Sequence, residues 1–113
     1  MTASESVSLM RLDDYAQEQS IEHIDLLKID AEGHELSVLK GAEGMISAGK
    51  IDLIQFEFGG ACIDSRVFLR DYVRFLEPHY DLGRVIVDDV VPLRWDEYEE
   101  VFSTCNFLAT RRT

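Results

Sequence analysis

The alternation of short apolar runs with a segment of helical periodicity constrains this chain more than any other feature. Residues 24–30 and 51–58 are compact apolar runs of strand length, and each ends at a turn that contains glycine. Between them, Val38, Ala42 and Met45 recur at the spacing of one helix face. Strands that a helix separates are joined by right-handed crossovers and lie parallel in one sheet. The sequence therefore predicts an α/β fold with a mostly parallel sheet.

The rest of the chain repeats the same periodicities and completes the predicted order of elements. The further elements expected, in chain order, are a weak strand at 7–9, a helix that Asp13 caps and that extends to about Ser20, a helix from 34 that Gly49 stops, a helix capped by Asp64 or Ser65 and ended before Pro78, a strand at 80–87, a helix at 96–102 and a strand at 105–110. Only a short helix separates the last two strands, which could therefore pair antiparallel. The run 24–30 is apolar on both faces, as is typical of a strand that helices cover on both sides.

Length and composition exclude several classes of protein. The 113 residues fit one domain, with residues 1–6 as a loose start, and an apolar fraction of 46% is enough for a core. The net charge of −11 argues against nucleic acid as a partner, because phosphate-backbone binders need a basic face. No apolar run has membrane-spanning length and no secretory signal is recognisable, which argues against a membrane partner. Cys62 and Cys105 are too few for a disulfide framework, so we expect a cytoplasmic protein.

Acidic residues follow both central strands. Asp30 and Glu32 follow the first run, Glu57 ends the second, and His34 stands at the start of the intervening helix. Ligands of open α/β sheets bind beyond the carboxyl ends of the parallel strands, so these side chains are candidates for one site. They could ligate a hard divalent cation, act as a general base toward a hydroxyl, or accept hydrogen bonds from a cationic part of a ligand. His34 could also serve as a catalytic or ligand-binding residue.

Each candidate also has a purely structural interpretation. Glu32 and Glu35 could simply be helix-start acids, and Glu57 could pair with Lys28 inside the sheet. The spacing alone leaves these alternatives open. The three residues of a basic stripe, spaced as one helix face, are either a solvated face or a site for an anion or a partner: Arg66, Arg70 and Arg74.

Residues 24–42, Ile-Asp-Leu-Leu-Lys-Ile-Asp-Ala-Glu-Gly-His-Glu-Leu-Ser-Val-Leu-Lys-Gly-Ala, resemble the signature of FkbM-type S-adenosylmethionine-dependent methyltransferases. The flanking segments fit as well, and the resemblance covers about residues 7–110. It implies a class I, Rossmann-like methyltransferase sheet whose last strand runs antiparallel. On that template, residues 24–30 and 51–58 are the fourth and fifth strands, and 80–87 and 105–110 are the sixth and seventh.

The resemblance also implies a function. It points to O-methylation of a hydroxyl on a small metabolite or a sugar, with S-adenosylmethionine as the cofactor. Asp30 stands where the acid after the fourth strand can approach the cofactor's amine or a Mg²⁺ ion, and Glu57 stands near a second such acid. Glu57 or Glu32 would accept the proton of the acceptor hydroxyl.

One part of the family pattern is missing from the 113 residues. No strand is followed by the glycine-rich loop that holds the cofactor, so we expect only the C-terminal, acceptor-facing half of the fold. The fourth strand would then be an unprotected edge that recruits another chain or the segment at 7–10. The alternative function is therefore a non-catalytic association module acting through strand 24–30. We expect a homo-oligomer or a complex with an N-terminal half.

Overall fold

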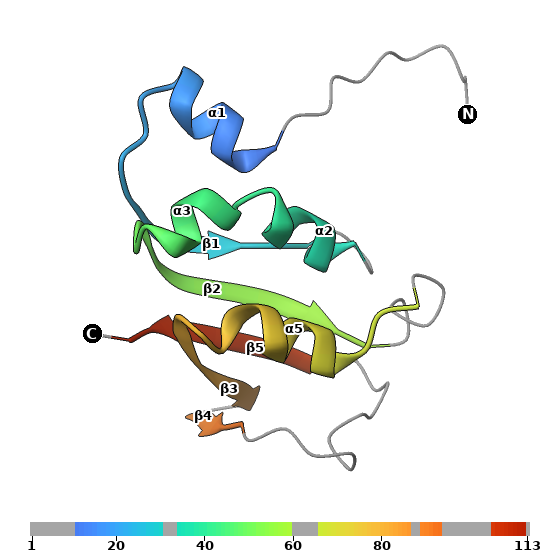
Figure 1. Ribbon diagram of the computed structural model, residues 1–113. Helices are drawn as coiled ribbons and strands as arrows, with labels where there is room; N and C mark the ends of the chain where they lie inside the picture. Colours follow the sequence, from blue (N-terminus) through green and yellow to red (C-terminus); the bar gives the residue numbers. More distant parts are fainter. Residues whose placement is uncertain (1–10, 31–33, 60–65, 87–88, 94–104, 113) are drawn as a thin grey trace.

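The computed structural model describes residues 11–30, 34–59, 66–86, 89–93 and 105–112, and Figure 1 shows how their helices and strands are arranged. The elements, in chain order, are α1 (Leu12–Glu18), β1 (Ile24–Lys28), α2 (Glu35–Lys40), α3 (Glu43–Ser47), β2 (Ile51–Phe58), α5 (Leu69–Leu76), β3 (Tyr80–Ile86), β4 (Asp89–Pro92) and β5 (Cys105–Arg111). The α/β class is confirmed. The predicted strand at 7–9 and helix at 96–102 lie outside the described residues.

The strands form one five-stranded sheet in the order β1-β2-β5-β3-β4. Only β1 and β2 pair in parallel, whereas β5 is antiparallel to both β2 and β3, and β3 and β4 form an antiparallel hairpin. The expectation of a mostly parallel sheet is therefore wrong, because β5 enters between β2 and β3 in the reverse direction. The expected antiparallel pairing of the two last predicted strands, now β3 and β5, is confirmed.

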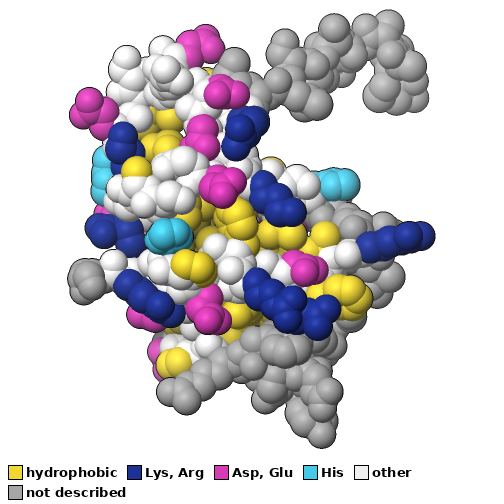
Figure 2. Space-filling view, in the orientation of Figure 1, with side chains coloured by type: hydrophobic (Ala, Val, Ile, Leu, Met, Phe, Trp, Pro, Cys, Tyr) yellow, Lys and Arg dark blue, Asp and Glu magenta, His cyan; other side chains and the backbone are white. Residues whose placement is uncertain are grey.

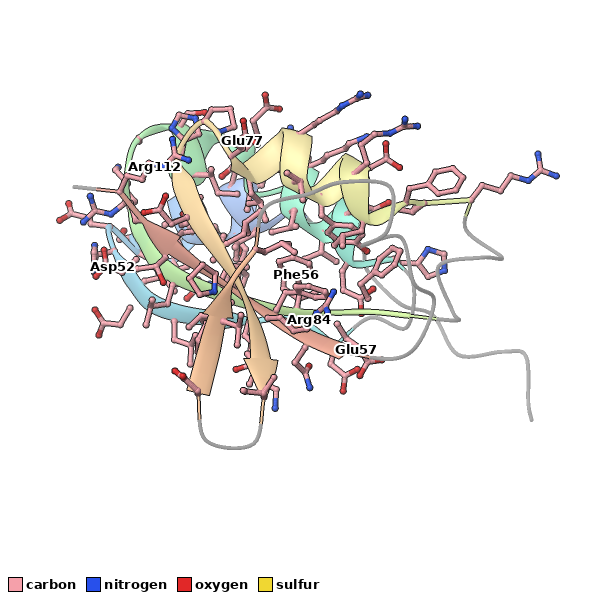
Figure 3. The ribbon with its side chains drawn as sticks, turned by 90° about the horizontal axis from the view of Figure 1, so that it is seen from below. Asp52, Phe56, Glu57, Glu77, Arg84 and Arg112 are labelled. Atoms are coloured by element: carbon pink, nitrogen blue, oxygen red, sulfur yellow. The ribbon has the colours of Figure 1, made fainter. Side chains whose placement is uncertain are left out.

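Helices α2, α3 and α5 lie on one face of the sheet, as Figure 3 shows in a view from below. That face presents the large side chains that alternate along β2 and β5. Phe56 stacks on Tyr72 of α5 with ring centroids 4.8 Å apart, and on Phe107 of β5 at 5.6 Å. The Arg84 guanidinium lies over the Phe107 ring at 5.5 Å. These rings form the centre of the core, and their burial is the main force that holds the helix layer on the sheet.

The opposite face of β1 and β2 carries a mixture of apolar and polar side chains. Leu26 pairs with Leu53, and Lys28 pairs with Gln55, so these four side chains share that face. Leu26 is 51% exposed. Strand 24–30 was expected to be covered on both sides. That expectation is wrong for the described residues, because their helices cover one face only and β1 lies at the edge of their sheet.

The helix predicted from residue 34 to 48 is divided into α2 and α3. Gly41 and Ala42 form the break, and the Asp13 carboxylate lies beside it. This carboxylate accepts hydrogen bonds from the backbone N–H groups of Gly44 and Met45, at 2.8 and 3.0 Å. Asp13 was expected to cap its own helix, but α1 begins at Leu12. The carboxylate instead caps α3, because the start of that helix offers unpaired N–H groups.

One other boundary and one additional strand differ from the sequence prediction. Helix α5 begins at Leu69, and the Asp71 carboxylate accepts a hydrogen bond from the Phe68 N–H at 2.8 Å. Asp64 and Ser65, the expected caps, lie outside the described residues. Strand β4 was not predicted, because its four residues are too short to show a period. Gly83 makes room for it, since a Cβ there would lie 2.3 Å from Val90.

Candidate functional site

Asp30 and Glu57 lie at the carboxyl ends of β1 and β2. The last pair in the parallel register is Lys28 with Gln55, and the Ile29 N–H donates to the Gln55 carbonyl at 2.9 Å. Asp30 and Glu57 each follow that pair by two residues, so the fold brings both carboxylates to the same end of the sheet. Asp30 is exposed and Glu57 is half-buried. The parallel pairing of the two strands, which sequence analysis required for this site, is confirmed.

The position of Glu57 is set by the pairing of β2 with β5 and by the buried end of β2. Its register partner on β5 is Asn106, and the buried Gly59 follows the strand. Figure 3 shows Glu57 at one end of β2 and Asp52 at the other. A half-buried carboxylate at a strand end can accept a proton from a hydroxyl or a hydrogen bond from a cationic group.

The other predicted site residues are at the start of α2. His34 directly precedes the helix and is exposed, whereas Glu32 lies outside the described residues. Glu35, interpreted from sequence as a helix-start acid, is only 1% exposed. Sequence reasoning missed this burial, although Leu39, four residues further along, lies on the same face of the helix and is fully buried. A buried carboxylate in the first turn of a helix is favoured by the positive end of the helix dipole.

The alternative interpretation of Glu57 as the partner of Lys28 is wrong. Lys28 lies opposite Gln55 in the register, and its side chain is exposed. Among the residues that the structure describes, Lys28 makes no ion pair. In the part of the chain that the structure describes, the Glu57 carboxylate is therefore not paired with Lys28.

The described residues hold one cluster with the donor set for a metal ion, and it lies at the opposite end of the strands. His23 Nε2 is 3.2 Å from Asp25 Oδ1 and 2.9 Å from Asp52 Oδ2. Arg111 donates from Nε and from its terminal nitrogen to Asp52 Oδ1, at 3.2 and 3.0 Å. The hydrogen bonds from Arg111 and then from His23 hold the pKa of Asp52 below its usual range. The predicted Mg²⁺ site at Asp30 and Glu57 has no support from this geometry.

Sequence analysis missed this cluster although a signal was present. His23 and Asp25 flank the start of one predicted strand, and Asp52 follows the start of the next. Parallel neighbours bring the starts of both strands together, just as they bring the ends together. The arrangement is an ion-pair network in which Arg111 already donates hydrogen bonds to one oxygen of the Asp52 carboxylate. Its side chains are open to solvent, since Asp25 is 94% exposed.

A second feature is a pocket between α2 and α5. It has a volume of about 480 Å³, and its lining is basic at the rim and apolar at the floor. Figure 2 shows Lys and Arg side chains around an apolar surface at this place. Two members of the predicted basic stripe, Arg66 and Arg74, line the pocket. The third, Arg70, lies over the Phe68 ring at 5.9 Å.

Within the described part of the chain, no helix is long and apolar enough to cross a membrane.

Comparison with known proteins gives one match. The sequence model of the methyltransferase FkbM domain matches residues 2–79, which include α1, β1, β2 and α5. The matched segment ends just before β3. No curated protein and no solved structure matches the chain.

Proposed function

This chain belongs to the methyltransferase FkbM family, and we propose that it forms the acceptor-facing half of an S-adenosylmethionine-dependent methyltransferase. The reaction proposed is O-methylation of a hydroxyl on a small metabolite or a sugar. The observation that carries the proposal is the family match over residues 2–79, which spans β1, β2 and the two carboxylates at their carboxyl ends, Asp30 and Glu57. The sheet supports it, because β5 is antiparallel to both of its neighbours, as the resemblance implies for the last strand.

The residues present fit one end of the cofactor. Asp30 is an exposed carboxylate beyond β1, and it can accept hydrogen bonds from an ammonium group. The 113 residues contain no strand followed by a glycine-rich loop, so the rest of the cofactor must contact residues outside them. The mixed apolar face around Leu26 and Leu53 supports this division, because it is the face that the described helices leave uncovered.

Bound S-adenosylmethionine supplies a methyl group on a positively charged sulfur. Glu57 takes the proton of the acceptor hydroxyl, and the hydroxyl oxygen thereby becomes able to accept that methyl group. The Glu57 carboxylate lies opposite Asn106 in the register and is half-buried at the strand end, which limits its contact with water. Glu32 and His34 remain predicted catalytic residues of the same site.

The proposal is tested by comparing cofactor binding of the chain alone with that of a fusion to a cofactor-binding half. Calorimetry with S-adenosylmethionine and the chain alone is expected to give no binding in the millimolar range. A fusion with the glycine-rich half of another FkbM methyltransferase is expected to bind. In that fusion Asp30→Asn should weaken binding at least tenfold, whereas Asp25→Asn, at the other end of β1, should leave it unchanged. A fusion that folds but binds no cofactor contradicts the proposal.

A second candidate function is association through β1. The observation that favours it is the edge position of this strand in the described sheet, together with the exposure of Leu26. An edge strand presents unpaired N–H and C=O groups that can pair with another chain. The proposed partner is a second copy of this chain, or an N-terminal half that pairs along the same edge.

Light scattering over a range of protein concentrations tests the association. We expect a dimer, and we expect Leu26→Lys to shift it toward monomer, because a charge then replaces apolar surface at the edge. Val38→Lys is the matched control, since Val38 is also an exposed apolar residue but lies on α2. A wild-type chain that is monomeric at high concentration contradicts this function and leaves the methyltransferase proposal intact.

A further inference from the structure

The pocket between α2 and α5 combines a basic rim with an apolar floor. Its seven lining residues come from both helices and the segment before α5, and they are Leu36, Lys40, Arg66, Val67, Asp71, Arg74 and Phe75. Leu36 is buried, while Val67 and Phe75 are partly buried and pack against the core. The floor is therefore a fixed part of the hydrophobic core, and the charged side chains stand around it.

Within the described residues, the three cations of this pocket form no ion pair with a carboxylate. The chain contains 22 Asp and Glu residues but only 11 Lys and Arg residues, so each cationic side chain has many possible ion-pair partners. Arg11, Arg111 and Arg112 each form an ion pair with an aspartate. Of the described cations without an ion pair, three line this one pocket, and they are Lys40, Arg66 and Arg74.

The charge of the pocket matches a dianion. Three cations face one carboxylate, that of Asp71, and one oxygen of this carboxylate already accepts the Phe68 N–H. The remaining charge of about +2 equals the charge of a phosphate monoester near neutral pH, with opposite sign. Arginine is also the side chain that best matches the geometry of phosphate oxygens.

The volume of the pocket and its apolar floor indicate what the ligand contains besides the phosphate. A volume of about 480 Å³ lies within the range of small-molecule sites and is too small for a folded partner. The floor of Leu36, Val67 and Phe75 offers apolar contact and no hydrogen-bonding side chain. A ligand that uses the whole pocket therefore has a phosphate at one end and an apolar body at the other.

We propose that the pocket between α2 and α5 binds a small phosphate monoester with an apolar body. Lys40, Arg66 and Arg74 hold the phosphate, and the body lies on Phe75, Val67 and Leu36. The site is separate from Asp30 and Glu57, and it goes beyond methyl transfer. A failure of this proposal leaves the family assignment unchanged.

Phenyl phosphate is a suitable probe, with inorganic phosphate and phenol as its two halves. In titrations followed by NMR, phenyl phosphate is expected to bind at least tenfold more tightly than either half. The amide signals that shift should belong to Leu36, Val67 and Phe75. Weak, unsaturable shifts with all three compounds would overturn the proposal, as would saturable shifts that map to another part of the sheet.

Charge variants give a second readout. Lys40→Gln combined with Arg74→Gln is expected to weaken phenyl phosphate binding at least tenfold. The matched control is Lys28→Gln combined with Lys50→Gln, which removes the same charge from exposed lysines outside the pocket and should change binding less than twofold. Circular dichroism checks that both variants are folded. Equal binding by the two double variants would mean that general charge attracts the probe, and would overturn the proposal.

Discussion

Phe56 of β2 and Tyr72 of α5 stack face to face, with ring centroids 4.8 Å apart and ring planes inclined by 3°. Both side chains are 1% exposed or less. This contact joins the longest described helix to a central strand, so it fixes the helix layer on the sheet that carries Glu57. The stability of the site therefore depends on this stack.

Phe56→Ala is expected to destabilise the fold by about 3 to 5 kcal/mol, because it removes a buried ring and leaves a cavity beside Tyr72 and Phe107. Urea unfolding followed by circular dichroism measures the loss. Tyr15→Ala is the matched control, since Tyr15 is 48% exposed and its removal should cost well under the loss at Phe56. Similar losses in both variants would show that the stack does not hold the layers together.

Asp13→Ala is expected to destabilise the fold by about 1 kcal/mol, because two N–H groups at the start of α3 lose their acceptor. The neighbouring Asp14 is exposed, and Asp14→Ala removes the same charge from the same helix. Urea midpoints of the two variants separate capping from charge. If Asp14→Ala costs as much as Asp13→Ala, the cap is not the cause.

The stabilising contribution of Tyr80 is expected to be lost at high pH. Its hydroxyl donates to the Ile51 carbonyl at 2.6 Å, and burial raises its pKa to about 12. The unfolded chain loses this proton near pH 10, whereas the folded chain keeps it to about pH 12. The contribution of Tyr80 is therefore complete below pH 10 and is lost as the pH rises toward 12.

The Tyr80→Phe variant checks this pH dependence. It should cost about 1 to 3 kcal/mol at neutral pH, because a buried carbonyl loses its donor. Its loss of stability between pH 10 and 12 should also be smaller than that of the wild type. Identical slopes in that window would contradict the assignment.

The stabilising contribution of Asp52 is expected to be lost at low pH. Its pKa is lowered by hydrogen bonds from Arg111 and His23, so the folded chain loses the proton more readily than the unfolded chain. Its contribution is present above the unfolded pKa of about 3.8 and is lost as the pH falls through the lower folded value. NMR titration should show that Arg111→Gln raises the pKa of Asp52. Arg112→Gln, beside Asp81, should leave it unchanged.

Much of the fold could be predicted because the periods of β1, β2, α5 and β3 are uninterrupted. The errors occur where a contact distant in sequence decides the outcome. The sequence predicts that Asp13 caps its own helix, but the fold brings its carboxylate to the Gly44 N–H, at the start of α3. Strand β4 is too short to carry a period, and it forms because Gly83 lets Val90 approach.

The candidate site, too, could be predicted only in part from the sequence. Sequence analysis placed Asp30 and Glu57 at strand ends and expected the two strands to be parallel neighbours, which the register confirms. The burial of Glu35, the ion-pair network of His23, Asp25 and Asp52, and the pocket of unpaired cations were not predicted. Each of these depends on side chains from different elements, which a single periodic pattern does not relate.

The sequence by itself determined the α/β class, the FkbM family and the position of two carboxylates after two parallel strands, because local periods and a continuous signature carry that information. Only the tertiary structure decided the addition of β4 to the sheet edge, the uncovered face of β1 and β2, and the grouping of Lys40, Arg66 and Arg74. Those properties arise from packing and charge between segments that are distant along the chain, so they appear only when the chain is folded.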